Sequence, residues 1–333
     1  MKIILSCCFA FLLCVFLTWG VRVYASRKMI LDIPNERSSH KTPIPRGGGI
    51  AIILTFFLSL IWLYLIGYVE SNLLLALIGG GSVLAVVGYY DDVYSLNARW
   101  RILFHLCTAV WSLYWLGGFP LLDIGFLKLH LPWLGPALAI ISIVACINFY
   151  NFMDGIDGLA GSEGIFIGLT SGAALWWIGE THLALVLWLL TFSIMGFTVW
   201  NWQPAKIFLG DVGSGFLGYT FATLGLYSVN KQFLPPTFWW IILAVFICDA
   251  LFTLVQRIYQ GKKWHQAHRE HAYQHLIACG AEHQHVTLGI LLFNCALLLP
   301  TAFAALSWPK QSLWLMLGIT MCLWLTWRWI KTR

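Results

Sequence analysis

Long runs of apolar residues, separated by short polar segments, alternate along the whole chain of 333 residues. Each run is roughly 17 to 23 residues long, the length that an α-helix needs to cross about 30 Å of hydrocarbon. The pattern predicts an all-α polytopic membrane protein with about 11 transmembrane helices. We expect them near residues 3–24, 48–68, 72–90, 102–118, 132–150, 161–178, 182–199, 213–229, 236–256, 286–307 and 312–327. Because no linker or soluble segment interrupts the pattern, a single integral membrane domain should cover residues 1–333.

Composition and charge agree with this interpretation and add an orientation. With 59% hydrophobic residues and a mean hydropathy of +0.77, the chain is too apolar for a soluble domain. All but four of the 20 Lys and Arg residues lie in or beside alternate connections, near 25–47, 91–101, 151–160, 200–212, 257–285 and the C-terminal tail. The exceptions are Lys2, Lys128, Lys231 and Lys310. The positive-inside rule then predicts a periplasmic N-terminus and a cytoplasmic C-terminus. The net charge of +6 therefore requires no nucleic acid as a partner.

The first apolar run has a second interpretation, as a cleaved signal peptide. Lys2 precedes it, and Val23-Tyr24-Ala25 resembles a small-residue cleavage site. The run is longer than a usual signal core, and Arg27 and Lys28 follow it. These features favour a retained first span.

The polar residues gather on the predicted cytoplasmic side. The connection LDIPNERSSHKTPIPRGGG, residues 31–49, is either a basic loop that sets topology or a flap over an anionic ligand, with Lys41 and Arg46 as its partners. Asp91 and Asp92 end the third span. Adjacent carboxylates repel each other, so they are either two solvated loop acids or a pair that a metal or a basic partner stabilises.

Two further polar clusters lie in the middle of the chain. In NFYNFMDGIDGLAG, residues 148–161, Asn148, Asn151, Asp154 and Asp157 recur every three residues, so on a helix they would line one wall. The glycines of this segment indicate instead a close backbone approach, a helix end or an ordinary turn. In KIFLGDVGSGFLG, residues 206–218, Asp211 falls where a helix should begin, three residues after Phe208. Helix capping is the simplest explanation of Asp211.

The last connection, GKKWHQAHREHAYQH over residues 261–275, is rich in His, Lys and Arg. A zinc site and a solvated basic loop are two interpretations, and phosphate binding is the third and preferred one, because neither Cys nor an H-E-x-x-H motif accompanies the histidines. Glu163 and Asp249 are acids inside apolar spans, for which side-chain chemistry alone indicates no role.

Carboxylate and amide oxygens suit a hard divalent cation such as Mg²⁺. A diphosphate substrate needs such a metal together with cationic side chains, and the loops supply both. The membrane location suggests that one substrate is a lipid. A transporter and a structural subunit are the alternatives. A transporter would place its polar residues near the middle of the bilayer, and a subunit would not need three Asp/Asn-rich loops on one side.

Taken together and in this order, the five motifs resemble those of the polyprenyl-phosphate N-acetylhexosamine-1-phosphate transferases of glycosyltransferase family 4. The resemblance covers essentially the whole chain. DIPNERSSHKTPIPRGGG and HREHAYQH are most similar to the O-antigen initiating branch. It implies transfer of HexNAc-1-phosphate from UDP-GlcNAc, or from a 6-deoxy sugar such as UDP-FucNAc or UDP-QuiNAc, to undecaprenyl phosphate, with UMP as the second product. It also implies Mg²⁺ or Mn²⁺, a bacterial inner membrane location with a cytoplasmic active site, and either a monomer or a homodimer.

The same resemblance assigns roles to individual residues. Those implied to handle the metal and the nucleotide are Asn151 and Asp211 (metal), Phe208 (stacking on uracil), Asp157 (the uracil edge) and Lys41 (near the nucleotide). Those implied to handle the phosphates are Asp91 and Asp92 (the lipid phosphate), Asp154 (the acidic wall), and His268, Arg269 and His271 (diphosphate and sugar). Because a phosphate monoester is largely dianionic at neutral pH, our hypothesis is that Asp91 and Asp92 mainly position the lipid phosphate or a metal. Proton removal is then secondary.

Overall fold

The computed structural model describes residues 2–34, 42–119, 122–123, 125, 127–263 and 268–333, and these residues are almost entirely helical. The helices of the first half are α1 Lys2–Arg27, α2 Gly49–Leu65, α3 Ser71–Leu75, the π-helical turn η1 Ala76–Gly80, α4 Gly81–Tyr94, α5 Ala98–Trp115 and α6 Leu134–Phe152. Those of the second half are α7 Leu159–Trp177, α8 Thr181–Asn201, α9 Gly210–Asn230, α10 Pro236–Tyr259, α11 Ala272–Ala278, α12 His283–Phe293, the π-helical turn η2 Asn294–Leu298, α13 Leu299–Ser307, the 3-10 turn η3 Pro309–Gln311 and α14 Ser312–Lys331. Two antiparallel pairs of two-residue strands join β1 Leu31–Asp32 to β2 Ile44–Pro45, and β3 Leu122–Asp123 to β4 Lys128–Leu129.

Each apolar range predicted from the sequence coincides with one long helical segment, so the all-α prediction is confirmed. Seven segments of the described chain are long and apolar enough to cross a membrane: 3–27, 71–94, 134–152, 181–201, 236–259, 283–307 and 309–331. α2 is a shorter apolar helix of 17 residues. Many large apolar side chains remain exposed on the outer helices, for example Phe16 at 69% and Leu292 at 70%. Such surfaces suit lipid, and the chain is a multi-pass membrane protein.

Local sequence signals explain several helix boundaries. The Asn97 side chain caps α5 by accepting a hydrogen bond from the Arg99 N–H at 3.1 Å. Pro236 occupies the first position of α10, where its missing N–H costs no helical bond. α4 ends at Ser95, which adopts a left-handed conformation (φ 53°). Ser95 and Asn97 therefore delimit the short connection between α4 and α5, which follows Asp91 and Asp92.

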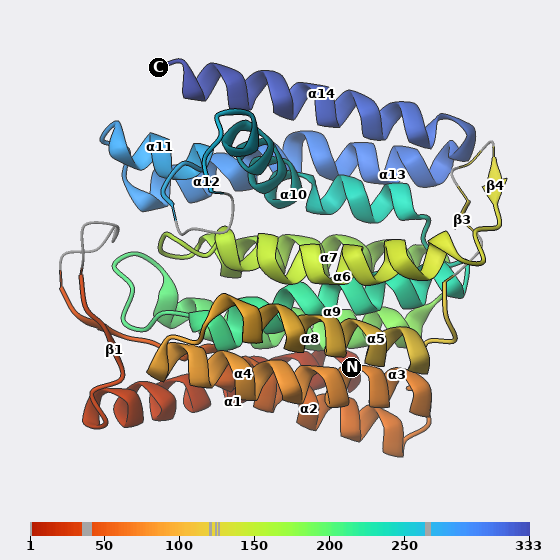
Figure 1. Cartoon of the computed structure of the whole chain (residues 1–333). Helices are drawn as coiled ribbons and strands as arrows, with labels where there is room; N and C mark the ends of the chain where they lie inside the picture. The colour runs from red at the N-terminus through yellow and green to blue at the C-terminus, as the bar shows by residue number, and fades with distance from the viewer. Residues whose placement is uncertain (1, 35–41, 120–121, 124, 126, 264–267) are drawn as a thin grey trace.

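The helices pack side by side into one bundle, with most connections at its two ends (Figure 1). β1, α11 and the connection that precedes α9 gather at one end, and β3 and β4 lie at the other (Figure 1). α4 and α6 both pack against α9. The contact of α4 with α9 is close at Gly88, where a methyl group would overlap the backbone of Val212. This contact brings the C-terminal end of α4 next to the N-terminal end of α9, and so sets the distance between their acids.

Candidate active site

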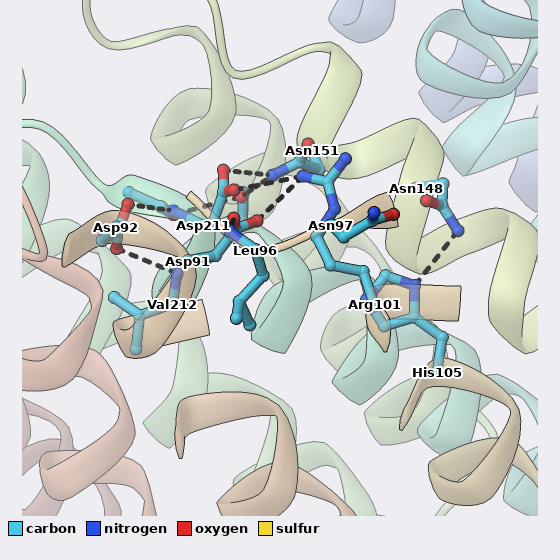
Figure 2. A network of polar contacts seen from close by, with 12 residues as sticks. Asp91, Asp92, Leu96, Asn97, Arg101, His105, Asn148, Asn151, Asp211 and Val212 are labelled. Atoms are coloured by element: carbon cyan, nitrogen blue, oxygen red, sulfur yellow. Dashed lines mark hydrogen bonds and ion pairs between the residues drawn. The ribbon is translucent and has the colours of Figure 1, made fainter. Parts of the chain in front are cut away.

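The adjacent acids of α4 have different partners. Both are buried, with exposed fractions of 7% for Asp91 and 3% for Asp92. The Asp92 carboxylate accepts hydrogen bonds from the backbone N–H groups of Asp211 (3.0 Å) and Val212 (3.3 Å), as Figure 2 shows. It therefore caps the N-terminus of α9 from a different helix, since α9 has no capping side chain of its own. The capping interpretation of Asp211 is wrong in this respect, because Asp211 is the capped residue.

Asp91 faces a cation instead. Its Oδ2 accepts a hydrogen bond from Arg101 Nη1 at 2.8 Å, and its Oδ1 accepts one from the Leu96 N–H at 2.6 Å. The same Arg101 Nη1 lies 3.5 Å from Asp211 Oδ2. One guanidinium on α5 thus bridges the acids of α4 and α9 (Figure 2). The repulsion expected between these acids is offset by a fixed positive charge.

The amides of α6 complete the network. Asn151 Nδ2 donates to Asp211 Oδ1 at 2.7 Å and to Ser214 Oγ at 2.9 Å. Asn148, one turn earlier, donates to the Val144 carbonyl at 2.7 Å and lies 3.3 Å from the ring of His105. Asn151 and Asp211, which the resemblance pairs, are therefore in contact, whereas Asn148 turns toward α5 (Figure 2).

The prediction of four polar groups along one helical wall is wrong, because α6 ends at Phe152. Asp154 and Asp157 lie in the turn that leads to α7. Burial, together with the nearby charges of Asp92 and Asp157, raises the pKa of Asp154 to about 7. Asp154 therefore carries only part of its charge near neutral pH.

Asp157 is buried and engaged with other loops. Its Oδ2 accepts a hydrogen bond from the Ala205 N–H at 3.0 Å, and its Oδ1 lies 3.3 Å from His283 Nδ1. The Thr287 hydroxyl donates to its carbonyl at 3.2 Å. These contacts tie the turn after α6 to the connection before α9 and to α12.

Phe208 and Arg46 lie next to the N-terminus of α9. The Phe208 N–H donates to the Pro45 carbonyl at 2.8 Å, and the Gly48 N–H donates to the Phe208 carbonyl at 2.9 Å. Arg46 Nε lies 3.9 Å from Asp92 Oδ1, so this arginine also faces the acids. Lys41, the third cation expected here, lies outside the described residues.

The last connection, which contains His268, Arg269 and His271, contacts the end of α6. The His271 ring lies 6.1 Å from the ring of Phe152 between centroids, and the Tyr273 hydroxyl donates to the Phe152 carbonyl at 3.0 Å. Phe152 directly follows Asn151. Burial and the neighbouring His271 and Arg257 lower the pKa of His268 to about 4, so this ring is neutral near neutral pH. Arg269 is exposed.

The donor set fits a hard divalent cation. Among the described residues, no group of three or more His, Cys, Asp or Glu side chains forms a ready-made metal cage. Mg²⁺ is usually bound by one or two carboxylates together with water and substrate phosphates. Asp211, Asp91 and the Asn151 amide oxygen could supply such a partial shell, and Arg101 now supplies the positive charge there.

Arg101 and His105 are the site residues that sequence reasoning missed. In the sequence analysis Arg101 was counted only among the basic residues that indicate the cytoplasmic side. Its position in the first turn of α5, with His105 one turn later on the same face, could have indicated a site residue. A small cavity is lined by Asp91, Arg101 and Asp211 of the network, by His105 and Asn148, and by apolar residues such as Leu84 and Val87.

Comparisons with known proteins agree with this geometry. Residues 74–229 match the family model described as glycosyl transferase family 4. A Bacillus subtilis protein described as a probable undecaprenyl-phosphate N-acetylglucosaminyl 1-phosphate transferase is 29% identical over 301 residues, which cover 88% of this chain and 81% of the relative. The decaprenyl-phosphate N-acetylglucosaminephosphotransferase of Mycobacterium tuberculosis is 27% identical, over 91% of this chain and 82% of its own.

A third relative comes from Salmonella typhi. This undecaprenyl-phosphate alpha-N-acetylglucosaminyl 1-phosphate transferase is 28% identical over 81% of this chain and 76% of its own. The matched residues 74–229 include Asp91, Asp92, Arg101, Asn151 and Asp211, the whole of the network between α4, α5, α6 and α9. Over residues 74–229 the chain matches glycosyl transferase family 4, and over most of its length it is similar to undecaprenyl-phosphate N-acetylglucosaminyl 1-phosphate transferases.

Proposed function

We propose that this enzyme transfers N-acetylhexosamine-1-phosphate from a UDP-sugar to undecaprenyl phosphate, giving undecaprenyl-diphospho-HexNAc and UMP. The observation that carries the proposal is the network in which Arg101 bridges Asp91 and Asp211 while Asn151 holds the other Asp211 oxygen. It combines oxygen donors for a metal with a cation for phosphate, around a small cavity that apolar residues also line. The relatives are N-acetylglucosaminyl 1-phosphate transferases by name, which supports UDP-GlcNAc as the first donor to test. UDP-FucNAc and UDP-QuiNAc follow from the motif resemblance.

In this reaction an oxygen of the lipid phosphate attacks the phosphorus that carries the sugar, and the bond from that phosphorus to the bridging oxygen breaks, so that UMP leaves. Bound Mg²⁺ or Mn²⁺, held by Asp211 and Asn151, would neutralise charge on the diphosphate. Arg101 would then turn from Asp211 toward the lipid phosphate, while its ion pair with Asp91 keeps the guanidinium in place. Phe208 and Asp157 would receive the uracil, while His268 and Arg269 would meet the diphosphate. Proton removal is a minor task, because the lipid phosphate is already ionised.

The location belongs to the same proposal. Eleven helical segments, an outside N-terminus and an inside C-terminus would place the connections that carry Asp91, Asn151 and Asp211 on the cytoplasmic face of a bacterial inner membrane. UDP-sugars are cytoplasmic substrates, so this side is the one that the reaction requires. The product would start an O-antigen or another cell-envelope glycan.

The test is a reaction with purified full-length protein, undecaprenyl phosphate, Mg²⁺ and separate UDP-HexNAc donors, with UMP and the lipid product measured together. We expect UMP to form only when the lipid phosphate and a divalent cation are both present, and EDTA to stop it. If no donor gives UMP, the proposed reaction is wrong. UMP release without a lipid product would indicate hydrolysis instead of transfer.

A further inference from the structure

The inference concerns Asp249, a carboxylate in α10 that lies outside the acidic network described above. It is buried, with 8% of its surface exposed, and its helix is otherwise lined there by apolar residues such as Cys248 and Ala250. A carboxylate in such a place is costly unless hydrogen bonds compensate it. Its partners should therefore reveal what it does.

Three of those partners belong to the last connection. Asp249 Oδ1 accepts a hydrogen bond from the Ala272 N–H at 2.8 Å and lies 3.7 Å from His271 Nδ1. Oδ2 accepts one from the Tyr273 N–H at 3.4 Å. Within its own helix, Oδ1 also accepts from the Thr253 hydroxyl at 3.2 Å. The carboxylate thus fastens the backbone of Ala272 and Tyr273 to α10 and lies within ion-pair distance of the His271 ring.

The motif resemblance assigns His268, Arg269 and His271 to the diphosphate. These three side chains differ in how far they are exposed to solvent. His271 is only 3% exposed, whereas His268 is half-buried and Arg269 is exposed. The rings of His268 and His271 lie 4.9 Å apart between centroids. His271 therefore stands between Asp249 and His268, too deep to meet a substrate itself. In many sites a carboxylate orients one side chain, which in turn orients a neighbouring functional group. Here Asp249 would orient His271, and His271 would orient His268.

A second set of contacts fixes the same connection at Glu270, one residue before His271. Glu270 Oε1 accepts a hydrogen bond from Arg257 Nη1 at 2.5 Å, and Glu270 Oε2 lies 3.1 Å from Lys262 Nζ. Although burial alone would raise it, hydrogen bonding from Lys262 and the charge of Arg257 hold the pKa of Glu270 below its usual value. The segment that contains His268 and Arg269 is therefore anchored at Glu270 and again at residues 271–273.

We propose that Asp249 and His271 are positioning residues, which hold His268 and Arg269 toward the diphosphate of the UDP-sugar without touching it. The proposal rests on the proposed function for the identity of the ligand. The anchoring of residues 271–273 by Asp249 stands on the contacts alone. The two parts can therefore be tested separately.

The first arm compares amide hydrogen exchange of the full-length wild type with that of Asp249→Asn, which replaces one acceptor oxygen with a donor. We expect the amides of residues 270–273 to exchange at least about 10-fold faster in the variant, and those around Asp211 to remain unchanged. Glu163→Gln is the matched control. Glu163 is another buried acid inside a helix, but it accepts a hydrogen bond from the Asn294 side chain at 2.7 Å, and no hydrogen bond or ion pair links it to the described residues of this connection. Equal exchange in wild type and Asp249→Asn would overturn the anchoring.

The second arm measures kcat and KM for the UDP-sugar. We expect Asp249→Asn and His271→Ala to raise KM at least about 10-fold, with a smaller change in kcat. His268→Ala should then have little further effect in the Asp249→Asn background, because the two residues act as one unit. A loss of kcat at unchanged KM, or fully additive effects, would overturn the positioning role. If the wild type uses no UDP-sugar, the proposed function fails, and the exchange arm still decides the anchoring.

Discussion

Arg101 has the most contacts to acids of any single side chain described at the site, since its guanidinium reaches both Asp91 and Asp211. An arginine stays charged at any physiological pH, and its planar group suits carboxylate and phosphate equally well. It can therefore neutralise the acids in the free enzyme and turn to phosphate when substrates arrive. The Asp211 carboxylate shares its two oxygens between Arg101 and Asn151, and Asn151 also donates to Ser214 Oγ.

Asp211→Ala should reduce turnover at least about 10²-fold, because it removes a charged group that stabilises the transferring phosphate. Initial rates of UMP release at saturating Mg²⁺ would measure this. Glu180→Ala, which removes an acid in the turn between α7 and α8, serves as control and should remain within a few-fold of wild type. Activity of Asp211→Ala within a few-fold of wild type would contradict the assignment.

Asp91→Asn separates a positioning role from a base role. The change removes the charge that holds Arg101, so we expect a loss of at least about 10-fold that persists when the pH is raised to about 9. At that pH the lipid phosphate is wholly ionised and needs no base. A pH profile of kcat for both proteins is the measurement. Recovery of a near-normal rate at high pH would support the base role and contradict ours.

At the scale of single residues, the sequence predicted the site only in part. The contact of Asn151 with Asp211, 60 residues apart, was expected from the motif resemblance. The capping of α9 by Asp92 was not, because the partners of a buried carboxylate depend on which helices pack together. Arg101 was missed because a basic residue at a membrane boundary has a sufficient explanation in topology.

At the scale of helices, the contact of α4 with α9 determines how close Asp91 and Asp92 lie to Asp211. The helix ranges could be predicted because hydropathy alone determines them. The pairing of α4 with α9 could not, since a helix face that touches lipid and one that touches another helix are equally apolar. The informative residues are small ones such as Gly88, whose role appears only when the partner is known.

Gly88→Ala should separate α4 from α9, since the added methyl group meets the backbone of Val212, which cannot move as a flexible side chain could. We expect a destabilisation of about 1–3 kcal/mol and a fall in turnover of at least about 10-fold. Thermal unfolding in detergent and UMP release are the two measurements. Gly289→Ala in α12 is the control, because nothing lies within 4 Å of the added group. Wild-type values for both variants would show that the contact does not control the site.

At the scale of the whole molecule, the arrangement places the polar network and the last connection at one end of a long bundle (Figure 1). The seven segments that meet the requirements of a membrane span come from both halves of the chain. The remaining long helices are shorter or less apolar, which is expected of helices that are surrounded by protein. α9, with 15 of its 21 residues buried, is the clearest example.

Reporter fusions test the proposed orientation. A reporter that works only outside the cytoplasm should be active after Gly179 and after Gly118, and inactive after Ser95 and at the C-terminus. The opposite pattern should appear with a reporter that works only in the cytoplasm. The fusions after Gly179 and at the C-terminus serve as controls for each other. Both contain every helix up to α7, but their reporters should lie on opposite sides of the membrane. Activity of the first reporter at the C-terminus would contradict an inside C-terminus.

The capping of α9 by Asp92 also has a consequence for biogenesis. The two partners are 119 residues apart in the chain, so α4 is synthesised and inserted well before the backbone groups that its carboxylate binds. Until then Arg46, Arg101, the Leu96 N–H and water compensate Asp91 and Asp92, without the two backbone groups of α9. The catalytic end therefore matures late in translation. A nascent chain that stops before α9 exposes two unsatisfied acids at the membrane surface, a signal by which quality-control proteases can distinguish an incomplete enzyme from a finished one.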